Sequence, residues 1–106
     1  MGTNYYYKLN MCPYCLRPEK TLHLGKNSCG WNFLLQANPD YYKTSWYVMK
    51  DWLLHTDGII ENEYGEIINK HEFIKLVEDT QGDKSHEGPY IVKDEEGYEF
   101  CMVDFS

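Results

Sequence analysis

The chain has 106 residues, of which 42% are hydrophobic and 16% aromatic, and its formal net charge is −7. This length and composition predict one folded domain with one modest core, and they exclude a disordered tail. Because an acidic chain gains no counterion release on DNA, non-specific nucleic-acid binding is not expected.

The charge is unevenly distributed along the chain. Residues 1–56 contain six Lys/Arg and three Asp/Glu, a balance of +3, whereas residues 57–106 contain four Lys and fourteen Asp/Glu, a balance of −10. An acidic second half usually serves solubility, and it can also face a basic surface of a partner.

The sequence gives no sign of a membrane or of secretion. No apolar run approaches the roughly 18 residues that a membrane-spanning helix needs, and residues 1–7 are unlike a signal peptide. We therefore expect the chain in the cytoplasm, where its four cysteines favour metal binding or free thiols over disulfides.

The first half of the chain predicts three short strands followed by a helix. Strands are expected at 5–8, 21–24 and 31–36, and the last two would pair as a hairpin across the glycine-bounded connection 25–30. After the loop 37–43, Ser45 can cap a helix that extends to about His55. Its buried stripe follows helical spacing and comprises Trp46, Met49, Trp52 and Leu53.

The second half predicts a strand, turn and strand over 59–68, with the turn at 62–65. Asn69 can then cap a second helix, which buries Phe73, Leu76 and Val77. Residues 80–88 are a polar loop, and 90–105 form a C-terminal hairpin.

This order of elements predicts a fold class. Strands, helix, strands, helix and strands follow one another without the regular strand–helix alternation of a parallel sheet. We expect a single α+β domain over 1–106, a small antiparallel sheet with two helices on one face, into which a zinc-knuckle-like hairpin at 10–36 is integrated.

Cys12 and Cys15 form the clearest chemical motif. Their spacing, with Pro13 between them, lets both thiolates face one ion, and structural zinc needs about four ligands. The run Cys-x2-Cys-x7-His-x5-Cys adds His23 and Cys29 and would close a tetrahedral zinc site. A pair of reduced surface thiols and a redox pair are the alternatives, and Cys101 and His55 are more distant substitute ligands.

The segment 23–31 is the densest polar and aromatic cluster. His23 supplies a switchable donor or acceptor, Lys26 a cation, Ser28 a hydroxyl and Trp31 a stacking face. Together they suit an anionic group next to a flat ring, as in a nucleotide. An ordinary hairpin with Trp31 in the core is the alternative, and the other candidate ligand-binding residues are Tyr6, Glu63 and Tyr64.

Several segments resemble one family. They are the opening 1–6, the Cys12–Cys15 pair, residues 22–31, residues 63–65 and the ending 100–106. They are similar to a set of small proteins encoded by bacteriophages and prophages, and the similarity extends over most of the chain. The resemblance implies an accessory protein inside a bacterial host and brings no established activity. Some members lack the cysteine pair and keep the 22–31 segment, which implies that His23 can serve a binding site in place of zinc.

These patterns favour binding over catalysis, because no established catalytic motif can be assembled. We expect a protein that interferes with a host process or an antiviral defence. It would either mask a host protein, as an anti-CRISPR protein does, or sequester a nucleotide signal, and a homodimer is left open. The alternative is a small hydrolase of a nucleotide or nucleic acid, with His23 as acid or base, Glu63 as its complement and Lys26 as charge stabiliser.

Overall fold

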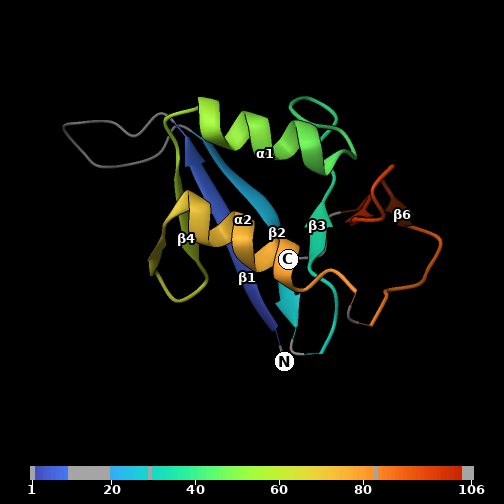
Figure 1. The fold of residues 1–106 in the computed structure, drawn as a ribbon. Coiled ribbons are helices and arrows are strands. Elements are labelled where there is room, and N and C mark those ends of the chain that lie inside the picture. The colour runs from blue at the N-terminus through green and yellow to red at the C-terminus, as the bar shows by residue number, and fades with distance from the viewer. Residues whose placement is uncertain (1, 10–19, 29, 83, 104–106) are drawn as a thin grey trace.

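The computed structural model describes residues 2–9, 20–28, 30–82 and 84–103 (Figure 1). Over these residues the helices are α1 (Trp46–His55) and α2 (Lys70–Asp79). The strands are β1 (Gly2–Leu9), β2 (Lys20–Ser28), β3 (Leu34–Gln36), β4 (Ile59–Asn62), β5 (Ile67–Ile68), β6 (Ile91–Lys93) and β7 (Glu99–Cys101). Neither of the two described helices is long and apolar enough to cross a membrane.

The described strands form one seven-stranded sheet in the order β5-β4-β1-β2-β3-β7-β6. Neighbouring strands run antiparallel except β3 and β7, which are parallel, with Leu35 opposite Phe100. The α+β prediction is confirmed, but a purely antiparallel sheet is wrong. Of the two strands in the C-terminal hairpin, β7 is the one that pairs with β3, and the two run parallel.

The strands expected at 21–24 and 31–36 belong to neighbouring antiparallel strands, but they pair through positions 25 and 26, which were expected to lie in the connection. β2 continues to Ser28 and pairs along its whole length with β1, from Leu9 opposite Lys20 to Gly2 opposite Ser28. Its pairing with β3 is confined to Gly25–Leu35 and Lys26–Leu34. The glycine-bounded segment therefore extends a strand, because β1 offers it a long partner. Residues 10–19, which hold the N-terminal part of the predicted zinc-knuckle hairpin, lie outside the described residues.

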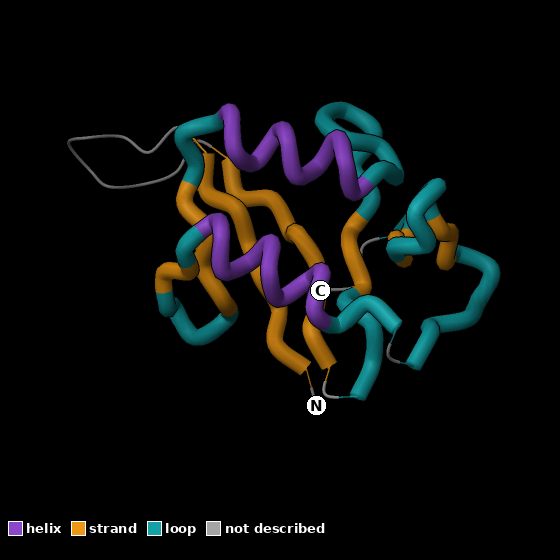
Figure 2. The backbone as a smooth tube through the Cα atoms, in the orientation of Figure 1, coloured by secondary structure: helices purple, strands orange, loops and turns teal. Residues whose placement is uncertain are grey.

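Both helices lie on the same face of the sheet (Figures 1 and 2). The predicted caps are confirmed, since the Ser45 side chain accepts a hydrogen bond from Val48 N and the Asn69 side chain accepts one from His71 N. The core between helices and sheet includes Trp46, Met49, Leu53, Phe73, Val77, Tyr5, Tyr7, Leu24, Leu35 and Phe100.

β1 separates the two faces of the sheet. Its residues Tyr5, Tyr7 and Leu9 are buried in the core, whereas Tyr6 and Lys8 are half-buried and point to the opposite side. No described helix covers that opposite side, which we call the helix-free face (Figure 2).

The Tyr7 hydroxyl group ties β1 to the end of α1. It accepts a hydrogen bond from Gly58 N at 3.0 Å and lies 3.2 Å from Thr56 O and 3.4 Å from Leu53 O. Tyr7 has no solvent-exposed surface. Gly58 must be glycine at this place, because a Cβ atom there would lie only 2.6 Å from Tyr7 Cε1.

Replacing Tyr7 by phenylalanine should lower the free energy of unfolding by about 1–3 kcal/mol, because Gly58 N–H would be buried without an acceptor. Urea denaturation followed by tryptophan fluorescence measures this difference. The matched control is Tyr47→Phe, at a side chain that is 70% exposed and should change stability by less than about 0.5 kcal/mol. Equal stability of the two variants would contradict the role of this hydroxyl.

Candidate functional site

Four of the predicted ligand-binding residues lie together on the helix-free face, over β1 and β2. The strand pairing sets Tyr6 opposite His23, Asn4 opposite Lys26 and Gly2 opposite Ser28. Directly paired residues of an antiparallel sheet share a face. The ring centroids of Tyr6 and His23 are 5.3 Å apart, so the two rings are in contact.

A register shift is what brings His23 and Lys26 to the same face. Residues three apart in a regular strand point to opposite faces, because side chains alternate. Here Gly25 pairs with Tyr5 but His23 pairs with Tyr6, so Leu24 is left without a direct partner. Leu24 is buried on the core side. Because this extra residue forms a β-bulge, the side chains of His23 and Lys26 on either side of it point to the same face.

His23 is held between two amide groups. Its Nε2 lies 3.0 Å from Asn4 Oδ1 and its Nδ1 lies 3.3 Å from Gln36 Oε1. The orientation of the Asn4 amide follows from its own donor, since Asn4 Nδ2 donates to Glu63 Oε1 at 3.3 Å. The orientation of the Gln36 amide is fixed likewise by donation from Nε2 to the backbone carbonyls of Ala37, Cys101 and Val103.

The chemical consequence concerns the protons of the ring. Amide oxygens only accept hydrogen bonds, so a His23 ring nitrogen bonds to its amide when it carries a proton. A neutral imidazole has one N–H group and the imidazolium form has two, so the tautomer decides which of the two contacts is a hydrogen bond in the neutral ring.

Lys26 supplies a cation on the same face as His23. Within the described part of the chain, its ammonium group has no hydrogen-bond or ion-pair partner. Gly2 makes room for it, because a Cβ atom at Gly2 would lie 2.5 Å from Lys26 Cε and 2.6 Å from Ser28 Oγ. By contrast, Lys8 on the same face is neutralised by Glu61, with Nζ 2.9 Å from the carboxylate.

Glu63 and Tyr64 border this face differently. Glu63 Oε1 accepts a hydrogen bond from Asn4 N at 2.7 Å, so Glu63 fixes the turn after β4 to β1. Tyr64 is 67% exposed, and its backbone N–H donates to Asn62 Oδ1. Glu63 thus acts on His23 only through Asn4, and Tyr64 stands out from the turn.

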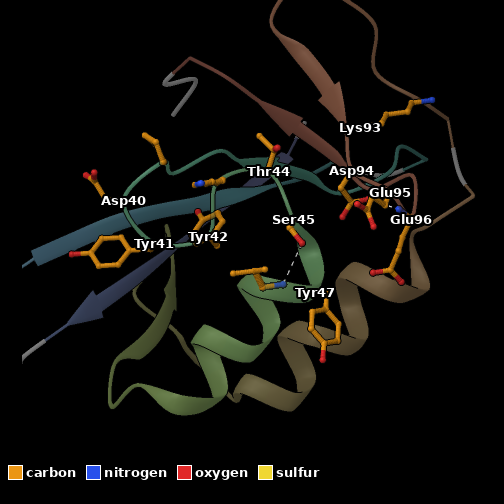
Figure 3. Close-up of a pocket in the computed structure, with 13 residues that line it drawn as sticks. Asp40, Tyr41, Tyr42, Thr44, Ser45, Tyr47, Lys93, Asp94, Glu95 and Glu96 are labelled. Atoms are coloured by element: carbon orange, nitrogen blue, oxygen red, sulfur yellow. Dashed lines mark hydrogen bonds between the residues drawn. The ribbon is translucent and has the colours of Figure 1, made fainter.

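A hollow of about 920 Å³ lies elsewhere, between residues 39–48 and the turn that joins β6 to β7 (Figure 3). Tyrosines, carboxylates and two lysines line it. Local sequence patterns do not reveal it, because its two walls are some fifty positions apart in the chain.

Trp31 does not belong to the group formed by Tyr6 and His23. Its ring stacks on His86, with centroids 5.0 Å apart and an angle of 21° between the planes, and Lys84 Nζ lies 4.6 Å from its centroid. These residues line a second hollow of about 570 Å³. Trp31 is half-buried, so the alternative that it belongs to the core is also not what the structure has.

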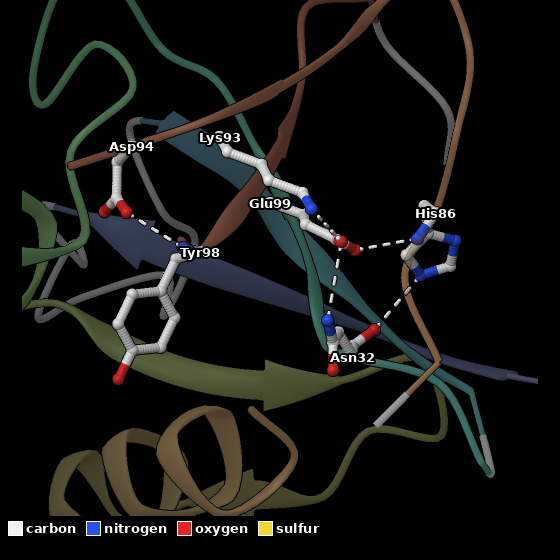
Figure 4. Close-up of polar contacts among 6 residues, drawn as sticks. All are labelled: Asn32, His86, Lys93, Asp94, Tyr98 and Glu99. Carbon is white, nitrogen blue, oxygen red and sulfur yellow. Dashed lines mark hydrogen bonds and ion pairs between the residues drawn. The ribbon is translucent and has the colours of Figure 1, made fainter. Parts of the chain in front are cut away.

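Glu99 is a buried carboxylate that sequence reasoning missed (Figure 4). It accepts hydrogen bonds from His86 N at 2.9 Å and Asn32 Nδ2 at 3.4 Å, and Lys93 Nζ lies 3.9 Å away. His86 Nε2 lies 3.0 Å from Asn32 O. The cluster fastens the segment 84–86 to the sheet, while Asn32 Oδ1 is buried without a described partner.

The predicted zinc site stays a prediction. Cys12, Cys15 and Cys29 lie outside the described residues, and among the described ones no group of three or more His, Cys, Asp or Glu could hold a metal ion. Of the substitute ligands, Cys101 is buried on β7, and His55 Nδ1 lies 3.2 Å from Asp51 Oδ1. His23 could reach a metal ion only by giving up one of its two amide contacts.

Comparisons with known proteins do not assign a function to these residues. The chain matches no protein-family model, no curated protein and no solved structure.

The zinc prediction can be separated from the role of His23 by metal analysis. We expect one zinc ion per chain in the wild-type protein, none in Cys12→Ser/Cys15→Ser, and an unchanged amount in His23→Ala, because both ring nitrogens of His23 are engaged by amides. Inductively coupled plasma mass spectrometry of protein purified without chelators measures this. Wild-type protein without zinc would refute the site, and loss of zinc in His23→Ala would make His23 a ligand.

Proposed function

We propose that this chain is a binding protein that captures an anionic, ring-bearing ligand such as a nucleotide on the helix-free face of its sheet. It acts by binding and sequestering the ligand and not by converting it chemically. In the setting implied by the resemblance to phage proteins, it works in the cytoplasm of a bacterial host. There, removal of a nucleotide signal would interfere with a host process or an antiviral defence.

The observation that carries this proposal is the Lys26 ammonium group on the same small surface as the His23 imidazole, in an acidic protein. His23 contacts the side-chain oxygens of Asn4 and Gln36, and Lys26 lies opposite Asn4. An ammonium group that is not neutralised by a neighbouring carboxylate attracts phosphate strongly and can form charge-assisted hydrogen bonds. An anion is therefore the ligand that this surface favours.

The neighbouring side chains extend the match to a nucleotide. Ser28 lies beside Lys26 across Gly2 and offers a hydroxyl donor to the same anion. Tyr6 is half-buried against His23, and a planar base can stack on such a ring. A phosphate at Lys26 and Ser28 with a base at Tyr6 uses three of the four residues, and His23 packs against the Tyr6 ring.

The hydrolase alternative has less support from the same contacts. His23 and Glu63 both bond to Asn4 and not to each other, so they do not form an acid–base pair. Each ring nitrogen of His23 also faces an amide oxygen, so neither is placed to take a proton from a substrate unless that contact is given up. Incubation of the protein with a nucleotide panel should accordingly yield no product, and product that is lost in His23→Ala would restore the alternative.

Lys26→Met should weaken nucleotide binding about tenfold, a loss of about 1.4 kcal/mol, because the phosphate loses its strongest partner. Isothermal titration calorimetry with linear and cyclic nucleotides measures the dissociation constants. The matched control is Lys75→Met, an exposed lysine of α2 on the helix-covered side. Binding that is equal in the two variants, or absent in the wild-type protein, would refute the proposal.

Gly2→Ala tests the same site without changing any charge. A Cβ atom at Gly2 would displace the Lys26 and Ser28 side chains that now lie within 2.6 Å of its position. We expect weaker nucleotide binding, with a dissociation constant that rises in the same titrations, while the midpoint of thermal unfolding changes by only a few degrees. Unchanged affinity would mean that the ligand lies elsewhere.

A further inference from the structure

The hollow of Figure 3 is a groove with rigid walls. Asp94 fixes the turn between β6 and β7, because its Oδ1 accepts hydrogen bonds from Glu96 N at 2.9 Å and Tyr98 N at 2.8 Å. Asp94 Oδ2 accepts a further bond from Trp46 N at 2.8 Å, which joins the turn to the first turn of α1. The groove is therefore formed before any partner arrives.

The opposite wall is just as firmly held. Tyr42 is almost completely buried, and its hydroxyl donates to Gln36 O at 2.7 Å. Lys43 adopts a left-handed backbone conformation with φ 54° and donates its N–H to Asn38 O at 2.7 Å. These contacts shape residues 38–43 into a tight loop, from which Asp40 and Tyr41 project at one end of the groove (Figure 3).

Exposed apolar surface lies at the other end of the groove. Tyr47 and Val48 on the first turn of α1 line it and are 70% and 44% exposed. Tyrosine is enriched at protein interfaces, because its ring buries apolar area and its hydroxyl still finds a partner. Two large side chains left uncovered beside a groove of about 920 Å³ are available to a partner.

The lining of the groove carries four carboxylates and two lysines. Asp40 stands at one end and Asp94, Glu95 and Glu96 at the other, while Lys43 and Lys93 also line it. Burial and, to a smaller extent, the charges of Glu78, Glu96 and Asp94 raise the pKa of the nearby Tyr98 phenol. The groove therefore has a moderate excess of negative charge.

We propose that this groove docks a segment of a partner protein in which basic residues alternate with apolar ones. The Lys or Arg side chains of the segment would reach the carboxylates and the tyrosine rings of the groove. A cation over a tyrosine face and beside a carboxylate gains from both interactions. Nucleic acid is disfavoured by the sign of the charge, and a second copy of the chain would bring the same carboxylates face to face. The inference does not depend on the anion site of the helix-free face.

Fluorescence anisotropy with a labelled peptide that alternates arginine and leucine tests this docking. The variant Glu95→Gln/Glu96→Gln should weaken binding about tenfold, because two charge pairs of the rim are lost. The control Asp57→Asn/Glu72→Gln makes the same change in net charge at two exposed carboxylates outside the groove, and it should bind like the wild-type protein. Tyr47→Ala should also weaken binding, although it leaves the charge unchanged.

Three results would overturn the inference. The first is an equal loss of peptide affinity in the two charge variants, which would indicate unspecific attraction to an acidic protein. The second is that a glutamine–leucine peptide binds as tightly as the arginine–leucine peptide. The third is that the arginine–leucine peptide does not bind the wild-type protein at low salt. Lys26→Met should leave peptide binding unchanged, and Glu95→Gln/Glu96→Gln should leave nucleotide binding unchanged. Failure of either site is thereby distinguished from failure of the other.

Discussion

The alternation of side chains along β1 is the constraint on which the rest of this structure depends. One set of its residues, with Tyr7 at its centre, packs under the helices and receives the end of α1 through the Tyr7 hydroxyl group. The other set, with Tyr6 and Asn4, carries the contacts to His23. A slip of one residue would exchange the two sets, so packing of the core and formation of the candidate site are decided by the same register.

The bulge in β2 adds the second condition. Without it, His23 and Lys26 would point to opposite faces, and their side chains would not share a surface. Gly25 lies next to the bulge and lets β3 come close, because a Cβ atom at this position would lie 2.5 Å from Phe33 Cε1 and 3.1 Å from Leu35 Cα. The glycine in the 22–31 segment thus has a physical role, which is to admit the close approach of β3 while β2 changes register.

Local patterns in the sequence were sufficient for the local elements. Both helices, their caps at Ser45 and Asn69, and the strand–turn–strand around residues 62–65 follow from periodicity and capping chemistry, and all are present. The long-range pairings do not follow, because the sequence does not say which strand β7 will meet. That His23, Lys26 and Ser28 share a surface was expected from a compact hairpin, whereas the bulge in the pairing of β1 with β2 is the actual reason.

Trp31 and Glu99 illustrate the other limit. Trp31 was placed with His23 because the two are near in sequence, but its ring stacks on His86, which is 55 positions away. Glu99 lies next to Phe100 and reads as the outward-facing residue of an alternating strand. It is buried, and His86 of the loop after α2 supplies its backbone N–H as a donor, a contact that no local pattern predicts.

The contacts of Glu99 also explain why that end of the sheet is held by polar groups. A buried carboxylate is tolerated only when donors surround it, and here a backbone N–H, an amide and a lysine do so. Because Asn32 Nδ2 faces the carboxylate, its Oδ1 is turned away and has no hydrogen-bond partner among the described residues, which offsets part of the gain. Hydrogen bonds to Glu99 and Asn32 therefore hold the segment 84–86 against the sheet. The apolar core that stabilises the fold lies under the helices.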